Sequence, residues 1–156
     1  MLNNLLVEAR NLNFDKLLVR VFVVYKNANT NQILLLRRKK DDHLPNQEEL
    51  PGGKIEFSES LLAAAQRELQ EETGLLIQDL NLFQFIHFFD FEIKQQQARE
   101  FLLKVPVKTK KITFDIKEHD AYRWIDIQRL PQANLHPKFL EIVLAQRLAT
   151  VEFEPV

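Results

Sequence analysis

Six carboxylates crowd around one short apolar run of this 156-residue chain. They are Glu49, Glu56, Glu59, Glu68, Glu71 and Glu72. The chain holds only three glycines, Gly52, Gly53 and Gly74, and all three lie at the ends of this run. Glycine is used where the backbone needs a conformation or a closeness that a side chain would forbid. We therefore expect a loop that is shaped closely around something at its start, followed by a helix that ends sharply.

The run between the glycines is expected to be that helix. Ser58 is a good N-cap, Glu59 in the first turn suits the positive end of the helix dipole, and Gly74 suits a left-handed C-terminal cap. The apolar residues that recur at helical spacing and would pack inward are Leu61, Leu62, Ala65 and Leu69.

Three of the acids, Glu68, Glu71 and Glu72, are spaced three and four residues apart, so a helix places them on one face. Like charges there repel: at ~4 Å and an effective dielectric of about 20, each pair costs about 4 kcal/mol before screening. A divalent cation turns that repulsion into a binding site, and carboxylate oxygens suit Mg²⁺ or Mn²⁺ better than zinc. The alternative for such a face is a solvated acidic helix surface.

The spacing of the fixed residues favours the metal site. Gly53 is followed after five residues by Glu59, and after seven more by Arg67-Glu68-Leu69-Gln70-Glu71-Glu72-Thr73-Gly74-Leu75. The stretch from Gly53 to Leu75 resembles a complete Nudix box, the signature of the Nudix hydrolase superfamily. The resemblance implies an α/β fold, an α/β/α sandwich with a mixed β-sheet and the box as loop–helix–loop. It also implies that residues 1–156 form a single Nudix hydrolase domain.

The resemblance implies a hydrolase in which water attacks phosphorus and Mg²⁺, or Mn²⁺, neutralises charge. The residues that match the family's metal ligands are Glu68, Glu71, Glu72 and, through its carbonyl, Gly53. Glu59 and Arg67 match the pair that orients these acids, although an ordinary surface ion pair is the alternative for them.

The general base is left open by the resemblance. Within the box, Glu68 or Glu71 could accept the proton from water. Relatives also use an acid outside the box, and Glu118 is the best candidate here, with weaker claims for His119 and Asp120. Glu56, in the loop before the helix, could join the outer shell of the site.

Markers of several branches of the superfamily are missing. The chain has no cysteine, which the isopentenyl diphosphate isomerase branch requires, and the residues before Gly52 do not resemble the coenzyme A motif. The Pro or Tyr of the ADP-ribose and dinucleoside polyphosphate branches is absent from Phe89 to Ile93. We therefore expect a (deoxy)nucleoside triphosphate pyrophosphohydrolase that yields a nucleoside monophosphate and pyrophosphate. The alternatives are a hydrolase of another conjugate (ADP-ribose, a sugar nucleotide, a dinucleoside polyphosphate or capped RNA) and a silent nucleotide sensor.

Composition agrees with a small nucleotide as the partner. Hydrophobic residues make up 46% and charged residues 28% of the chain, which is ordinary for one globular domain. A net charge of −1 gives no reason to expect extended nucleic-acid binding. No signal peptide and no membrane span is visible, so a cytoplasmic enzyme is expected. Relatives often dimerise, and a homodimer stays open.

The elements that must position the box follow from periodicity. Strands are expected at residues 17–25, 33–38, 80–93, 99–107 and 121–125, with a C-terminal helix from Pro137. Residues 1–16 suit a short helix or an extended arm. Alternation in the third strand would place Phe83, Phe85, His87, Phe89 and Phe91 on one face. The basic loop from Arg37 to Lys40 could meet phosphates or be plain solvated surface.

Overall fold

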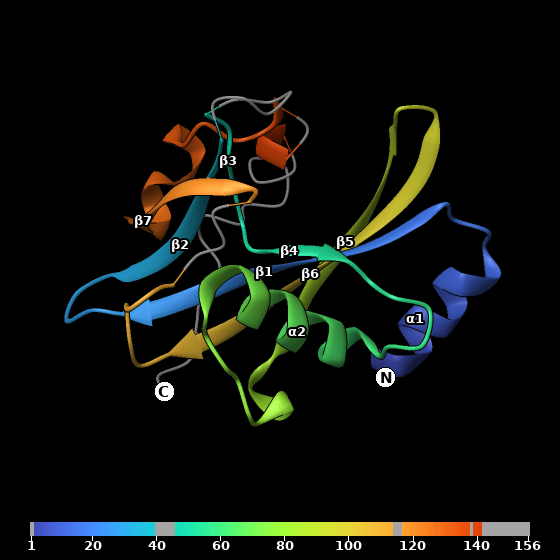
Figure 1. Cartoon of the computed structure of the whole chain (residues 1–156), viewed down its shortest axis with the longest axis horizontal. Coiled ribbons are helices and arrows are strands. Elements are labelled where there is room, and N and C mark those ends of the chain that lie inside the picture. The colour runs from blue at the N-terminus through green and yellow to red at the C-terminus, as the bar shows by residue number, and fades with distance from the viewer. Residues whose placement is uncertain (1, 40–45, 114–116, 138, 142–156) are drawn as a thin grey trace. The chain divides into compact units, whose positions relative to one another are not determined.

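The computed structural model describes residues 2–39, 46–113, 117–137 and 139–141 (Figure 1). The chain divides into two compact units, which are described in turn. The first unit comprises Met1–Phe22 and Pro51–Val105, and the second comprises Val23–Leu50 and Pro106–Val156.

The first unit holds most of strand β1 (Lys16–Lys26) with β4 (Gly52–Lys54), β5 (Gln84–Ile93) and β6 (Gln96–Val107). β4 pairs antiparallel with β1, β6 lies beside β1, and β5 pairs antiparallel with β6. The β-branched and aromatic residues of these strands favour an extended backbone. Consecutive residues are buried in β6 from Ala98 to Leu103, so both faces of this strand are covered. Their fully buried side chains include Val19, Val21, Phe22, Phe101 and Leu103.

The helices of the first unit are α1 (Leu2–Asn11), α2 (Leu61–Thr73) and the short 3-10 helix η1 (Leu80–Leu82). α2 lies against β4 and contacts α1 and η1 (Figure 1). The box therefore runs from β4 through a loop into α2, as expected.

The ends of α2 confirm one predicted cap and correct the other. Gly74 is left-handed at φ 74°, and its N–H donates to the Gln70 carbonyl at 2.9 Å. The N-cap is Ser60, whose hydroxyl accepts from the Ala63 N–H at 3.1 Å, so the prediction of Ser58 was wrong. Glu59 precedes the helix because it closes a turn, in which its N–H donates to the Glu56 carbonyl at 3.1 Å. Leu61, Ala65 and Leu69 are buried as expected, whereas Leu62 is half-buried.

The second unit is built around strand β2 (Asn31–Arg38), whose residues Ile33 to Leu36 are fully buried. β2 pairs antiparallel with the end of β1, with β3 (Glu48–Glu49) and with β7 (His119–Asp126). A 3-10 helix, η2 (Ile127–Gln132), follows β7 and buries Ile127 and Leu130.

β1 takes part in both units, and the strands form a seven-stranded sheet. Its order is β3-β2-β1-β6-β5, with β4 beside β1 and β7 beside β2. The predicted α/β class is confirmed. No helix in the described residues is long and apolar enough to cross a membrane.

The aromatic strand β5 departs from simple alternation. Its register against β6 shifts between Phe85 and His87, which pair with the adjacent residues Leu103 and Leu102. Adjacent residues of a strand face opposite sides, so Phe85 and His87 do too, and the single aromatic face that we expected is wrong.

Of the two structures left open for residues 1–16, the N-terminal segment adopts the helix, α1. Two strand boundaries differ from expectation: Phe83 lies between η1 and β5 and not in a strand, and β6 begins at Gln96 and not at Arg99. The hairpin turn is tight because Lys94 and Gln95 both adopt positive φ. Of the expected C-terminal helix, Pro137 and residues 139–141 are helical, and its remainder lies outside the described residues.

The two serines before α2 provide a test of the cap. Ser60→Ala removes the hydroxyl that accepts from the Ala63 N–H, and it is expected to lower the free energy of unfolding by about 1 kcal/mol. Ser58→Ala, two residues earlier and exposed, is the matched control and should stay within about 0.5 kcal/mol of wild type. Urea unfolding of the two variants measures both values, and equal losses would contradict the assignment of Ser60 as the cap.

Candidate functional site

One guanidinium, that of Arg67 on α2, organises the acidic segment. Its Nε and Nη2 donate to the two carboxylate oxygens of Glu59 at 2.6 and 2.8 Å. Its Nη1 donates to Glu68 at 3.0 Å and to Glu71 at 3.3 Å, and Nη2 also reaches the Lys54 carbonyl at 3.0 Å. Arg67 thus joins three acids and the backbone of β4, and the predicted Arg67–Glu59 pair is formed.

These contacts shift the pKa values of their partners in opposite directions. The hydrogen bond from Arg67 lowers the pKa of Glu59, and the hydrogen bond to Glu59 raises the pKa of Arg67. Burial raises the pKa of Glu68, although Arg67 acts in the other direction. A carboxylate whose charge is poorly solvated gains more than an exposed one from a nearby cation.

Glycine lets the backbone approach Glu68. A Cβ added at Gly53 would lie 2.6 Å from the nearer carboxylate oxygen of Glu68, closer than real Cβ contacts allow. Gly52 has φ 155°, and a Cβ there would lie 2.0 Å from the Val19 carbonyl oxygen. The expectation that these two glycines are needed for closeness is therefore confirmed.

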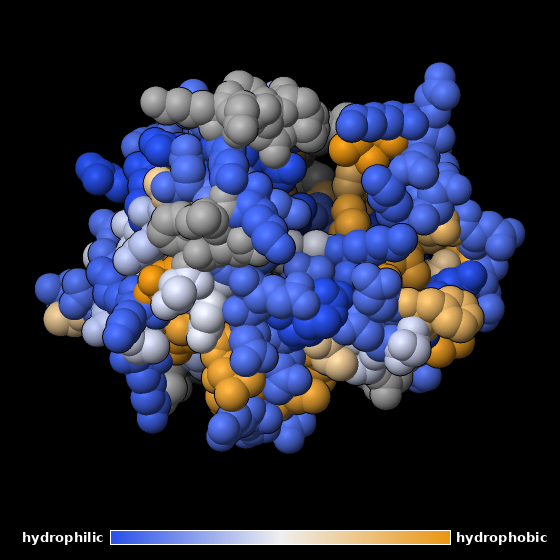
Figure 2. Space-filling view, viewed as in Figure 1, coloured by the Kyte–Doolittle hydropathy of each residue, from blue (hydrophilic) through white to orange (hydrophobic). Residues whose placement is uncertain are grey.

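The third box acid is fixed by the backbone. Glu72 is 6% exposed, and its Oε1 accepts from the Gly52 N–H at 2.8 Å. Glu68 is half-buried and Glu71 is exposed, so the three predicted ligands range from buried to solvated. In Figure 2, hydrophilic residues predominate where α2 faces the viewer.

The donors present fit a hard divalent cation. Glu68, Glu71 and Glu72 offer only oxygen atoms, and Gly53 leaves the space beside Glu68 that a side chain would fill. Arg67 offsets part of the negative charge through its contacts with Glu59, Glu68 and Glu71. The chemistry of these side chains therefore fits a divalent metal ion.

The three residues proposed outside the box as candidates for the general base belong to the second unit. Glu118 is exposed, and its carbonyl accepts from the Lys39 N–H at 3.2 Å. His119 is fully buried, with Nε2 2.8 Å from Glu49 Oε1, and Asp120 accepts from Arg37 at 2.9 Å. The role of Glu118 as general base stays a prediction.

The basic loop is partly used by the protein itself. Arg37 pairs with Asp120, and Arg38 Nη1 donates to both oxygens of Glu49 at 2.9 and 3.2 Å. Lys40 lies outside the described residues. Among the residues that are described, these arginines serve ion pairs within the second unit.

Two arginines near the box were not predicted. Arg20 on β1 lies opposite Gly52, donates to Glu100 at 2.8 Å, and is a minor influence that lowers the pKa of Glu68. Arg10 on α1 donates to the carbonyls of Glu56 and Glu59. A lone charge in the apolar run LLVRVFVVY was a visible sign for Arg20, whereas nothing in the sequence marks Arg10.

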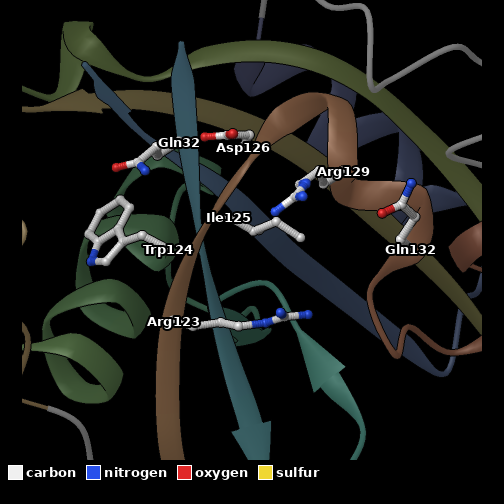
Figure 3. A pocket seen from close by; sticks show the side chains of 7 residues that line it. All are labelled: Gln32, Arg123, Trp124, Ile125, Asp126, Arg129 and Gln132. Atoms are coloured by element: carbon white, nitrogen blue, oxygen red, sulfur yellow. The ribbon is translucent and has the colours of Figure 1, made fainter. Parts of the chain in front are cut away.

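The second unit also contains an open pocket of about 300 Å³ (Figure 3). Its lining includes Arg123 and Trp124 of β7 and Arg129 of η2. Arg123 is already held by both carboxylate oxygens of Glu48, at 2.6 and 2.7 Å, and Trp124 packs edge-on against Tyr25 with ring centroids 6.1 Å apart. None of the predicted site residues lines this pocket.

Comparisons with known proteins converge on one family. A profile of the NUDIX domain matches residues 16–146. An 8-oxo-dGTP diphosphatase of Escherichia coli is 42% identical over 73 residues, which is 47% of this chain and 55% of that enzyme. An 8-oxo-dGTP diphosphatase of Buchnera aphidicola is 32% identical over 104 residues, 67% of this chain and 75% of that enzyme. The match to the E. coli enzyme therefore spans only about half of its length.

Solved structures agree on the fold. The NUDIX domain of Shewanella oneidensis NrtR complexed with ADP ribose superposes with a TM-score of 0.70 at 16% identity. The superposition covers 91% of this chain and 92% of that domain, and it shows a shared fold.

Substitutions at two glycines distinguish an effect on cation binding from an effect on the stability of the helix. Gly53→Ala places a methyl group against the Glu68 carboxylate, so Mg²⁺ affinity is expected to fall about 10-fold or more. Gly74→Ala instead strains the left-handed cap and should lower the free energy of unfolding by about 1 kcal/mol, with Mg²⁺ affinity unchanged. Calorimetric titration and thermal melts measure the two effects, and wild-type affinity in Gly53→Ala would contradict the site.

The contact between Arg67 and Glu59 makes the free energy of unfolding depend on pH in the acidic range. Because the folded pKa of Glu59 lies below its ordinary value of 4.5, the contact stabilises the fold above that pH and is lost as the pH falls through the lowered pKa. Arg67→Met is expected to destabilise the protein at neutral pH, and the difference from wild type should narrow below pH 4.5. Urea unfolding across this pH range measures the difference in the free energy of unfolding between wild type and Arg67→Met. A difference that does not change with pH would show that Glu59 is not coupled to Arg67.

Proposed function

The chain belongs to the NUDIX domain family, and on that premise we propose that it is a metal-dependent hydrolase of nucleoside diphosphate-linked compounds. The most specific form of the proposal is a (deoxy)nucleoside triphosphate pyrophosphohydrolase. The observation that supports it is the cluster in which Arg67 binds Glu59, Glu68 and Glu71 while Gly53 makes room for Glu68. Since the NUDIX match covers residues of both units, we also propose that they work as one domain.

The reaction requires water to attack phosphorus as the bond to the leaving pyrophosphate breaks. Bound Mg²⁺ or Mn²⁺ supplies charge neutralisation and lowers the pKa of water. The protein's part is to hold its acids in place before the substrate arrives, which avoids rearrangement during the reaction. Arg67 does this for Glu68 and Glu71, and the Gly52 N–H does it for Glu72.

The proton of the attacking water passes to a carboxylate. Glu68 is a candidate to accept it because it lies in the box and Arg67 Nη1 holds its carboxylate at 3.0 Å. Glu71 and Glu118 are exposed alternatives. The nucleoside monophosphate and pyrophosphate are then the two products.

The substrate class is supported by the two relatives named 8-oxo-dGTP diphosphatase. Both names describe hydrolysis of a modified purine triphosphate, so 8-oxo-dGTP and dGTP are the first substrates to compare. A conjugate is the second candidate, because a NUDIX domain of the same fold was solved with ADP ribose. A silent sensor is disfavoured because every acid of the box is present.

The function is tested by product analysis with Mg²⁺ over a panel of substrates. The panel contains nucleoside triphosphates, 8-oxo-dGTP, ADP-ribose, sugar nucleotides, dinucleoside polyphosphates and capped RNA. Monophosphate plus pyrophosphate from a triphosphate is the expected result. Turnover of a conjugate alone would keep the chemistry and overturn the substrate, and no turnover with cation bound would favour a sensor.

Substitutions of the box acids test the site itself. Glu71→Gln and Glu72→Gln keep the shape of the side chain but remove its charge, so each is expected to lower kcat by about 100-fold or more while the protein still folds. In Glu72→Gln the new amide oxygen can still accept from the Gly52 N–H, which protects the fold in that variant. Wild-type kcat in either variant would refute the assignment.

Glu118→Gln is the companion variant for the base. It leaves the box acids intact, so loss of kcat with unchanged cation affinity would identify Glu118 as the base. An unchanged kcat would leave that role to Glu68 or Glu71.

A further inference from the structure

Helix α1 precedes the NUDIX match, which begins at residue 16, yet it contacts the box helix. Its apolar side packs inward, with Leu6 at 2% and Ala9 at 0% exposure. The helix is therefore a fixed part of the first unit, and a polar side chain in its last turn is held at a defined place.

That side chain is Arg10. Its Nη2 donates to the Glu59 carbonyl at 2.8 Å and to the Glu56 carbonyl at 3.3 Å. These carbonyls belong to the loop between β4 and α2. The same loop is closed on itself, because the Glu56 N–H donates to Glu59 Oε1 at 2.9 Å and the Glu59 N–H donates to the Glu56 carbonyl at 3.1 Å.

Glu59 is consequently held by two arginines from two helices. Arg10 binds its carbonyl, and Arg67 binds both oxygens of its carboxylate. Arg67 also holds the start of the loop through the Lys54 carbonyl at 3.0 Å. The loop therefore has fixed points at Lys54, at Glu56 and at Glu59, and each is set by an arginine.

We propose that Arg10 is a positioning residue: it fastens the loop so that Glu59 stays in register with Arg67, and Arg67 in turn keeps Glu68 and Glu71 set for a divalent cation. Without Arg10 the two carbonyls turn to water and the loop gains conformational freedom. Arg67 then loses its fixed partner and is free to redistribute among the acids. The effect on turnover rests on the proposed function, whereas the effects on the loop and on cation binding do not.

The first experiment compares Arg10→Met with wild type in two measurements that need no substrate. Mn²⁺ affinity, measured by titration, is expected to fall about 10-fold, the range typical of residues that orient metal ligands. Amide hydrogen exchange, measured by NMR, is expected to accelerate at Glu56 and Glu59, while the Leu69 amide within α2 keeps its protection.

Two further variants show which property of Arg10 matters. Arg10→Lys retains the charge but lacks the planar fork, so its Mn²⁺ affinity is expected between those of wild type and Arg10→Met. Phe57→Ala removes an exposed ring that lies 5.8 Å from the guanidinium but leaves both hydrogen bonds, so affinity within about twofold of wild type is expected. Arg129→Met makes the same chemical change at an exposed position of η2 and is the matched control.

Wild-type Mn²⁺ affinity and wild-type exchange at Glu56 and Glu59 in Arg10→Met would overturn the proposal. A lower melting temperature with unchanged affinity would also overturn it, because Arg10 would then serve stability alone. If wild type binds Mn²⁺ and responds to Arg10→Met but hydrolyses no substrate, the proposed function fails while the positioning role holds.

Discussion

The contact between Arg67 and Glu59 is the interaction on which the rest of the site depends. Placing acidic side chains together on one helix face is unfavourable unless their charge is offset and their positions are fixed. Arg67 does both: its fork binds Glu59 at both oxygens, and its remaining donor reaches Glu68 and Glu71. The loop before α2, the end of β4 and the positions of Glu68 and Glu71 are all fixed by hydrogen bonds to this one guanidinium.

A second constraint is the close packing of the β4 backbone against its neighbours. β4 runs so near to β1 and α2 that Gly52 and Gly53 have no room for a side chain. As a result, main-chain groups reach the acids directly, as the Gly52 N–H reaches Glu72. Close approach and charge therefore act together: the glycines let the acids lie against the backbone, and the arginines keep them there.

The sequence was sufficient for features that depend on local spacing, and insufficient for those that depend on distant partners. The box helix, its glycine cap, the Arg67–Glu59 pair and the need for glycine at the start of the box all follow from a continuous stretch. The N-cap was misplaced because Ser58 and Ser60 are equally good caps by type, and the turn closed by Glu59 decides between them. The register shift in β5 is set by pairing with β6, and the contact of Arg10 spans 49 positions, so neither is visible in a local pattern.

The packing of Trp124 against Tyr25 has a spectroscopic consequence. The chain has one tryptophan and two tyrosines, and Trp124, Tyr25 and Tyr122 all belong to the second unit. Helices α1 and α2 belong to the first. Tryptophan and tyrosine fluorescence therefore reports the second unit, while far-ultraviolet circular dichroism, to which α1 and α2 contribute, reports secondary structure in both units. Following both signals during one denaturation shows whether the two halves melt as a single cooperative body or in sequence, without any added label.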